Sequence, residues 1–515
     1  MTVHLLHGAD GARHGFVPKK IVNFRLAHDA AMLRGAGVET VILNGQLAAR
    51  AVPDTALEAM RPGDLLVLPL LDGTTCAPSL EWAVRAKART GVRMVVCGEL
   101  ATFAATEILA MFPQVDVLIR GEEELELCRL ATGARQRAGI VTAEPVLPSR
   151  WKLPESGVWG RYAVAQSSRG CAYRCTFCSV NAFSDPDRAR ADWRGLSAGQ
   201  LQRWLQQLAD RGVTFVELAD ADVLGTTREG LDRARDLVRR GPAPVGLMVA
   251  TRADTIVDHP GLVAELVGYG VTRWQVGVES ADEATLRRFK KGLVPEVSLR
   301  AVRQLADLGA MVRMEFIMFE PDSTPRTLRA NLDMLAEFRD MGVSIQRALF
   351  NRLRVGRWSP AIVRRLVDEG RLRRHIFPLF DFTDNDPDVA EVFAGCAAAH
   401  SAELVKAEMI GLLLERLIDV GAGKAATAVT VAALAHRLDT LLWDLVDHLL
   451  TERTATSPTA RRPSSPSMAG WLATATALLD DIDVDACFPG TRAWLDSMLD
   501  RVPADAGIAG ATPWR

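Results

Sequence analysis

Apolar residues form short continuous runs, separated by amphipathic stretches, over about residues 1–135. The runs predict strands at Val3–Leu6, Thr40–Leu43, Leu65–Leu71, Arg93–Cys97 and Val115–Ile119. Helical spacing occupies the segments between them, for example Ser79–Ala88 and Ala101–Met111. Buried strands separated by helices indicate an α/β fold with a parallel sheet covered on both faces. Ligands of such sheets lie beyond the carboxyl ends of the strands, where the turns at Gly98 and Gly121 fall.

The same alternation returns over about residues 155–360. Its apolar runs predict strands at Ala163–Ser168, Phe215–Ala219, Gly246–Thr251, Trp274–Glu279, Val312–Phe319 and Ile345–Phe350. Helical patterns such as Ala198–Ala209 and Pro325–Phe338 lie between these runs. In parallel barrels built from βα units, the chemistry lies at the carboxyl ends of the strands.

Residues 361–515 predict a mostly helical region. Helical spacing covers Ala402–Asp419, Thr427–Leu450 and Ala469–Leu479, with a further helix near Thr491–Leu499. The apolar stretch Ile410–Val420 contains three charged residues, so it predicts a buried helix and not a membrane span. Ser, Thr, Pro and Arg dominate near 451–468, which predicts a flexible linker. We therefore predict domains at 1–140, 155–360 and 361–515.

Composition narrows the class of protein. The chain has 515 residues, 48% of them hydrophobic, and a net charge of −2, so nothing favours a nucleic-acid partner. Eight cysteines in this length do not make a disulfide scaffold. Met1–His7 has no basic segment followed by a long apolar run, so no signal peptide is expected. We expect a cytoplasmic enzyme that contacts no membrane.

The most informative motif is C-x3-C-x2-C, formed by Cys171, Cys175 and Cys178. Three thiolates so close together can bind one soft metal centre. A [4Fe–4S] cluster ordinarily takes four cysteines, and the flanking ones, Cys128 and Cys396, are far away in sequence. Three ligands would leave one iron open for a substrate or cosubstrate. A zinc knuckle, which needs a fourth ligand, and three unrelated thiols are the alternatives.

This spacing resembles the radical S-adenosylmethionine (SAM) superfamily, as does the aromatic Phe177 before the third cysteine. The resemblance implies that the open iron chelates SAM. It also implies that one electron from the cluster cleaves SAM to a 5′-deoxyadenosyl radical. The six predicted βα units are similar to the partial (β/α)6 barrel of that superfamily, in which the cluster follows the first strand.

The resemblance also implies SAM contacts at later strand ends. Besides Phe177, they are Glu217 and Asp220 of Val-Glu-Leu-Ala-Asp, Arg252 of Thr-Arg-Ala-Asp, Gly277, Glu279 and Ser280 of Gly-Val-Glu-Ser, and Met318 near the adenine. The residues alone leave alternatives open. The acids would then belong to an exposed loop, Arg252 would have a structural role, and Met318 would be part of the core. Lys290 and Lys291 read equally as solvated charges.

The first region resembles a domain of the cobalamin-binding (B12-binding) type. The resemblance lies in Val95–Leu109 and the following Val-Asp-Val-Leu-Ile-Arg-Gly-Glu-Glu. Such a domain precedes the barrel in one class of the superfamily, and it implies cobalamin as a further cofactor. The motif D-x-H-x-x-G is absent. A Rossmann-like domain that has lost cobalamin and serves as a scaffold is the alternative.

The implied reaction is functionalisation of an unactivated carbon, with cobalamin-dependent C-methylation of a small-molecule or natural-product intermediate as the expected outcome. A radical SAM dehydratase, epimerase, mutase or cyclase without cobalamin is the second hypothesis. A non-catalytic iron–sulfur scaffold or regulatory protein is the third. The implied partners are a small-molecule substrate and an external electron donor such as flavodoxin or ferredoxin.

Two further groups of residues stand outside the resemblance. Arg347, Arg352, Arg354 and Arg357 form either a cationic wall for an anionic substrate or ordinary surface charge. Cys396 and His400 have the spacing of a ligand pair on a helix, although buried and unliganded side chains explain them better.

Overall fold

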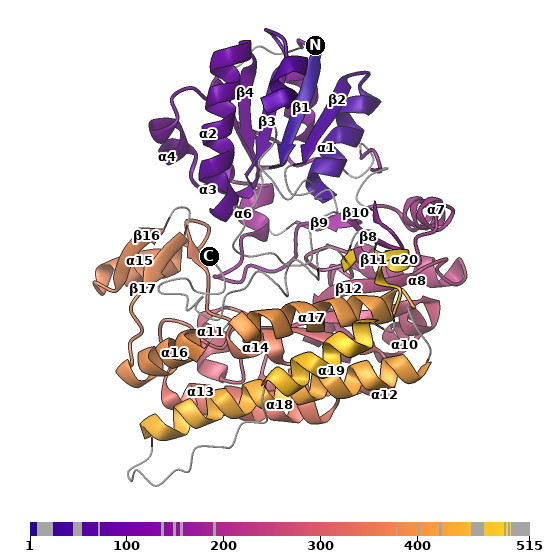
Figure 1. Ribbon diagram of the computed structural model, residues 1–515, viewed down its shortest axis with the longest axis vertical. Helices are drawn as coiled ribbons and strands as arrows, with labels where there is room; N and C mark the ends of the chain where they lie inside the picture. The colour runs from indigo at the N-terminus through magenta and orange to yellow at the C-terminus, as the bar shows by residue number, and fades with distance from the viewer. Residues whose placement is uncertain are drawn as a thin grey trace.

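The computed structural model describes residues 1–7, 24–44, 54–70, 73–134, 138–147, 151–154, 158–188, 192–376, 379–399, 402–421, 425–454, 468–480, 482–488, 491–492 and 495. Most of the predicted linker near 451–468, His400 and most of the predicted helix near 491–499 lie outside these residues. Figure 1 shows the N-terminal domain, in indigo and purple, stacked on the barrel, with the long C-terminal helices lying across the barrel.

The N-terminal domain is a parallel sheet of order β2-β1-β3-β4-β5-β6. The strands are β1 (Thr2–His7), β2 (Glu39–Asn44), β3 (Leu65–Pro69), β4 (Arg93–Cys97), β5 (Val117–Arg120) and β6 (Gly139–Thr142). The helices are α1 (Phe24–Gly35), η1 (Asp54–Ala59), α2 (Gly73–Thr90), α3 (Gly98–Phe103), α4 (Ala105–Met111) and α5 (Glu124–Ala131). Every residue of β3 is buried, and a separate hydrophobic cluster packs on each face of the sheet. The predicted covered parallel sheet is confirmed.

The barrel is a second sheet, of order β14-β13-β12-β11-β8-β7. Its strands are β7 (Val158–Trp159), β8 (Tyr162–Ala165), β11 (Phe215–Leu218), β12 (Gly246–Arg252), β13 (Val271–Glu279) and β14 (Met311–Phe316). The outer helices are α7 (Ala198–Ala209), α8 (Arg228–Arg239), α9 (Ala253–Asp258), α10 (Pro260–Tyr269), α11 (Glu283–Arg288), α12 (Pro295–Asp307) and α13 (Pro325–Asp340). All neighbouring strands from β8 to β14 pair in parallel, so their carboxyl ends meet at one edge.

The predicted sixth strand at Ile345–Phe350 is wrong. This segment forms α14 (Gln346–Leu349), and isolated bridges flank it, from Ser344 to Arg313 and from Arg352 to Phe319. The reason is a carboxylate from a distant helix. Asp439 Oδ1 accepts from the backbone N–H groups of Ile345 and Gln346 at 2.9 and 2.8 Å. Those donors are therefore not available for pairing with a neighbouring strand.

The C-terminal region is mostly helical, as predicted, and contains an unpredicted small sheet. Its helices are α15 (Pro360–Asp368), α16 (Pro387–Ala399), α17 (Ala402–Asp419), α18 (Ala425–Thr454), α19 (Met468–Asp480) and α20 (Val484–Cys487). An antiparallel sheet joins β15 (Val355–Gly356), β17 (Leu379–Phe382) and β16 (Leu372–Ile376). Apolar residues of α16–α20 pack in one continuous core with the barrel. No helix in the described part of the chain is long and apolar enough to cross a membrane.

Candidate active site

The three cysteines of the motif share one loop, between β9 (Ser168–Arg169) and α6 (Val180–Ser184). The Cys171 N–H donates to Asn181 Oδ1 at 3.1 Å, and Asn181 Nδ2 donates to the Tyr173 carbonyl at 2.6 Å. The Thr176 N–H donates to the Phe289 carbonyl at 2.9 Å, which ties the loop to the segment after α11. Hydrogen bonds therefore fix the loop on two sides.

A glycine sets the direction in which the loop begins. Gly170 has φ +75°, and a Cβ there would lie 1.7 Å from the carbonyl oxygen of Asp192. Asp192 comes just before β10 (Arg194–Gly195), which pairs antiparallel with β9. Only glycine combines this backbone conformation with so close an approach.

All three thiols are free, half-buried and close to one another. Burial raises the pKa of Cys171 to about 11 and that of Cys178 to about 12, and the charges of the neighbouring motif cysteines add to each rise. Among the described residues, no three His, Cys, Asp or Glu side chains converge as the ligands of a single metal ion do. Structural zinc sites take four ligands, whereas this loop offers three free thiols, the number that a [4Fe–4S] cluster with one open iron would use.

A buried ion pair lies beside this loop. Lys291 Nζ donates to Glu279 Oε1 at 2.8 Å, and Gly277 provides the space, because a Cβ there would lie 2.6 Å from Lys291 Nζ. Lys291 is 5% exposed, so its interpretation as a solvated charge is wrong. Burial raises the pKa of Cys175, while the charges of Lys291 and Arg252 lower it. The structure thus brings Arg252 and Lys291 near the Cys175 thiol. The residues next to Cys175 in the sequence gave no indication of this.

Arg252 is held in place at the end of β12. Its Nη2 donates to Asp254 Oδ2 at 2.8 Å and to the Lys291 carbonyl at 2.6 Å. The guanidinium carbon lies 3.5 Å from the centroid of the Tyr173 ring, inside the cysteine loop. Arg252 therefore connects β12, the segment after α11 and the motif.

Asp220 organises the chain just before the cysteine loop. Its carboxylate accepts from the Ser167 N–H at 2.7 Å, from Ser167 Oγ at 2.5 Å and from Ser168 Oγ at 2.7 Å. The side chain is 4% exposed. The structure thus gives Asp220 a fastening role between β11 and β9.

The remaining predicted contacts divide into two groups. Ser280 and Met318 are fully buried, and Ser280 Oγ donates to Asn331 Oδ1 at 3.0 Å. Glu217 and Phe177 are half-buried; the Tyr162 hydroxyl donates to Glu217, and the Phe177 ring lies 5.0 Å from that of Phe289. As contacts to a cofactor, these four residues stay predictions, as do Asp220, Arg252, Gly277 and Glu279.

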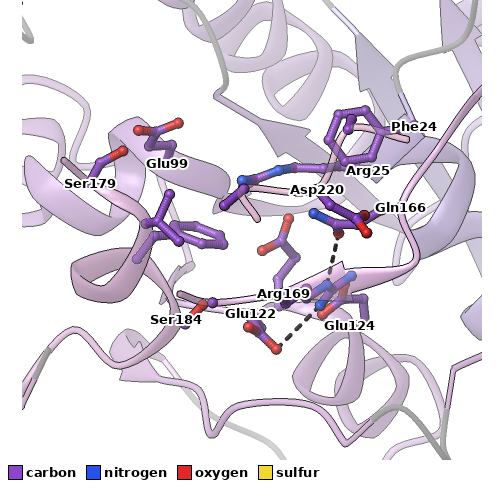
Figure 2. Close-up of a pocket in the computed structure, with 16 residues that line it drawn as sticks. Phe24, Arg25, Glu99, Glu122, Glu124, Gln166, Arg169, Ser179, Ser184 and Asp220 are labelled. Carbon is purple, nitrogen blue, oxygen red and sulfur yellow. Dashed lines mark hydrogen bonds and ion pairs between the residues drawn. The ribbon is translucent and has the colours of Figure 1, made fainter. Parts of the chain in front are cut away.

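The carboxyl edges of the two sheets face each other across a cavity of about 220 Å³. Figure 2 shows residues of both domains around it: Glu99 and Glu122 come from the N-terminal domain and Gln166, Arg169 and Asp220 from the barrel, with Glu122 next to Arg169. Gly170 and Ser179, which border the cysteine loop on each side, also line it. The cavity therefore connects the predicted cluster site with the ligand-binding edge of the N-terminal sheet.

A buried ion network closes one side of this cavity. Glu122 accepts from Arg169 at 3.2 Å and from Arg194 at 2.7 Å. Glu124 accepts from Arg169 at 2.5 Å and lies 3.2 Å from His28 Nδ1. Burial by itself would raise the pKa values of both glutamates, but Arg169 and the other partners lower them overall. Residues far apart in sequence thus join α1, α5, β9 and β10.

Two further buried carboxyls lie near this network. Glu123 lines the cavity and is 3% exposed; burial, and then the charge of Glu124, raise its pKa to about 7. Asp29 is 1% exposed, and neither carboxyl oxygen has a hydrogen-bond partner. Burial and the charges of Glu123 and Glu124 raise the pKa of Asp29 well above its usual range. The sequence could not reveal the raised pKa values of these two carboxyls, because the rise comes from their burial in the folded chain.

Residues 166–335 match the model of the radical SAM superfamily. Among curated proteins, the chain is similar to 4′-phospho-dehydrooxetanocin synthase of Priestia megaterium, with 29% identity over 33% of this chain and 25% of that protein. It is also similar to anaerobic magnesium-protoporphyrin IX monomethyl ester cyclase of Rubrivivax gelatinosus, with 23% identity over 47% of this chain and 49% of that protein. The chain thus spans between a quarter and a half of these relatives.

Two solved structures share the fold over most of the chain. OxsB, a cobalamin-dependent radical SAM enzyme solved with aqua-cobalamin and SAM, matches with TM-score 0.65 and 16% identity over 99% of this chain and 84% of its own. The methyltransferase TsrM from Kitasatospora setae matches with TM-score 0.57 and 19% identity over 72% of this chain and 77% of its own.

These findings define the class of protein. The chain is an enzyme with a radical SAM domain at residues 166–335, and nearly its whole length shares the fold of OxsB, a cobalamin-dependent radical SAM enzyme. The class implies a [4Fe–4S] cluster and SAM.

Proposed function

We propose that this enzyme uses SAM to functionalise an unactivated carbon of a small molecule, and that cobalamin-dependent C-methylation is the outcome. One observation carries the radical step. Three free thiols lie together on the loop after the first barrel strand, at the edge that faces the N-terminal domain. That is the edge at which parallel α/β proteins bind their ligands.

The residues around the loop have definable tasks. Cys171, Cys175 and Cys178 hold the cluster and leave one iron open. Arg252 and Lys291 place positive charge beside Cys175, which favours the thiolate form that binds metal. When bound, the cluster, SAM and cobalamin would supply an electron, a 5′-deoxyadenosyl radical and a transferable methyl group.

The proposed SAM contacts come from the ends of four strands. They are Glu217, Asp220, Arg252, Gly277, Glu279, Ser280 and Met318, together with Phe177 of the loop. Of these, Arg252, Gly277 and Glu279 surround the Lys291 ion pair next to the thiols. The electron donor would be an external protein such as flavodoxin or ferredoxin, in the reducing cytoplasm.

Cobalamin has weaker support from the described residues. No described histidine lines the interdomain cavity, and His28 is engaged with Glu124 and Arg169. The cavity of about 220 Å³ lies below the roughly 300–1,000 Å³ of ordinary ligand pockets. Support comes instead from the fold match with OxsB over 99% of the chain. The buried charge at this edge favours a second candidate, a radical SAM dehydratase, epimerase, mutase or cyclase without cobalamin.

The cluster assignment is tested first with Cys175→Ala. Anaerobically reconstituted protein should lose cluster iron, sulfide and the cluster's electron paramagnetic resonance signal, and 5′-deoxyadenosine formation should fall to background. Cys128→Ala, which changes a half-buried cysteine outside the motif, is the matched control and should keep all of these. A Cys175→Ala protein with an intact cluster signal would refute the proposal.

The two outcomes are separated by cofactor content and label transfer. Protein produced anaerobically with cobalamin should show the visible spectrum of bound corrinoid if methylation is correct. SAM carrying a deuterated methyl group should then pass that methyl to the product. The second candidate would be selected by two results together. The visible spectrum of the protein would lack corrinoid bands, and an unlabelled product would form together with 5′-deoxyadenosine.

A further inference from the structure

A second cavity, of about 280 Å³, lies at the opposite end of the barrel from the cysteine loop. Its walls are the first residues of β13 and β14, the segment Met341–Ala348, and helices α17 and α18. Most of the lining is small or apolar: Ala306, Met311, Met341, Val343, Ile418 and Val431. Three arginines, Arg273, Arg313 and Arg347, also line it.

Only one of these arginines is neutralised. Arg273 donates to Glu415 at 3.0 Å and to Asp419 at 2.9 Å, both on α17. Within the described part of the chain, Arg313 and Arg347 make no hydrogen bond and no ion pair, and the Nε atom of Arg313 is buried without a partner. The cavity therefore carries more positive than negative charge.

Arg313 and Arg347 are partly buried, and they differ in their pairing from the most buried arginines of the described part of the chain. The arginines that are less than a tenth exposed, Arg169, Arg194, Arg233, Arg252 and Arg273, each donate to at least one acceptor. The Nε–H group of Arg313 is buried without an acceptor, and a donor in that state costs free energy. Glu315, two residues from Arg313, forms no ion pair with it; burial raises the pKa of Glu315, and the charge of Arg313 partly opposes that rise.

The backbone places the two arginines on adjacent segments. Ser344 forms a β-bridge with Arg313, and Arg347 follows three residues later in α14. Both side chains then reach the same cavity. Paired guanidinium groups are the usual receptors of carboxylate and phosphate oxygens, which they bind in a bidentate manner.

We propose that this cavity binds a small amphipathic oxyanion, a carboxylate or phosphate joined to an apolar group. Arg313 and Arg347 take the oxyanion, and the apolar group packs against Met311, Met341 and Val431. The site lies away from the cysteine loop and does not depend on the proposed function.

The test measures binding of benzoate, phenyl phosphate, inorganic phosphate and uncharged benzyl alcohol to the full chain. Titration calorimetry and the thermal midpoint are the readouts. Benzoate or phenyl phosphate should bind and raise the midpoint by about 2–4 °C at saturating concentration, whereas benzyl alcohol should not. Preference between the first two identifies the head group. If inorganic phosphate binds as tightly as both, or if no anion binds, the proposal is overturned.

The variants Arg313→Gln and Arg347→Gln should each weaken binding by about tenfold or more. Arg354→Gln, which changes an exposed arginine after α14 and outside the cavity, should not. Ligand-free Arg313→Gln should unfold at the same temperature as the parent or higher, because it loses an unpaired charge. Unchanged affinity in both variants, or a fall of several degrees in the ligand-free midpoint, would show that these arginines are structural and that the proposal is wrong.

Discussion

Buried charge is arranged differently at the two ends of the barrel. At the carboxyl edge, Glu122 binds Arg169 and Arg194, and Glu124 binds Arg169 and His28, so both arginines have a carboxylate. At the amino edge, Arg273 is paired with two acids, whereas the partly buried Arg313 and Arg347 have no acid partner among the described residues. The first arrangement fastens two domains together. The second leaves the guanidinium groups of Arg313 and Arg347 available as hydrogen-bond donors beside a cavity.

The comparison shows why burial alone does not identify a functional charge. Arg169 and Arg313 are the same chemical group, and both contribute to a cavity. Only the presence of an acceptor separates a structural role from a ligand-binding one. Removing each charge should therefore change the stability in opposite ways.

The largest expected effect is that of Arg169→Met. It leaves Glu122 and Glu124 buried with one partner fewer each, which should cost about 3–5 kcal/mol of unfolding free energy. Urea unfolding measures the loss. Arg228→Met, at a side chain that is 97% exposed, is the control and should be nearly neutral. A loss below about 1 kcal/mol for Arg169→Met would mean that the network does not hold the domains together.

The next effect is a pH dependence that Asp439→Asn should remove. Burial raises the pKa of Asp439 to about 7, against about 3.9 in an unfolded chain. The folded protein thus keeps this proton where the unfolded chain loses it, so stability falls as the pH rises from about 4 to about 7. The contribution has a slope of at most about 1.4 kcal/mol per pH unit.

Unfolding free energies of the parent and of Asp439→Asn, measured across that pH range, give the slope by subtraction. The difference cancels other groups that titrate there, such as Glu123. Asp307→Asn, at an exposed aspartate on α12, is the control. Parallel curves for the parent and Asp439→Asn would contradict the prediction.

The smallest effect sharpens the comparison most. Arg313→Met should leave the ligand-free unfolding free energy unchanged, or raise it by up to about 1 kcal/mol, because no carboxylate loses a partner. Arg273→Met, in the same cavity, should lower it by about 2 kcal/mol or more, because Glu415 and Asp419 then lose theirs. Equal losses for the two variants would remove the distinction drawn between them.

Periodicity predicted most of the fold, because the order of apolar and polar residues within each strand or helix reflects which of its faces is buried. The predicted helices Ala198–Ala209 and Ala402–Asp419 match α7 and α17. The segment Ile345–Phe350 is equally apolar, yet it is helical, because Asp439 from α18 binds its backbone donors. A carboxylate some ninety positions away overrides the local pattern.

The sequence alone determined the cysteine motif and the class of chemistry, because the three thiols stand within one short loop whose spacing is visible in the chain. It also determined the two parallel sheets, because most of their strands are apolar runs separated by helical patterns. Only the tertiary structure decided which charges are neutralised. The partners of Arg169, Lys291 and Arg273 lie between 12 and 146 residues away. Such a charge either stabilises the fold or is available to bind a ligand. Which of the two applies depends on its distance to other charges, and only folding sets that distance.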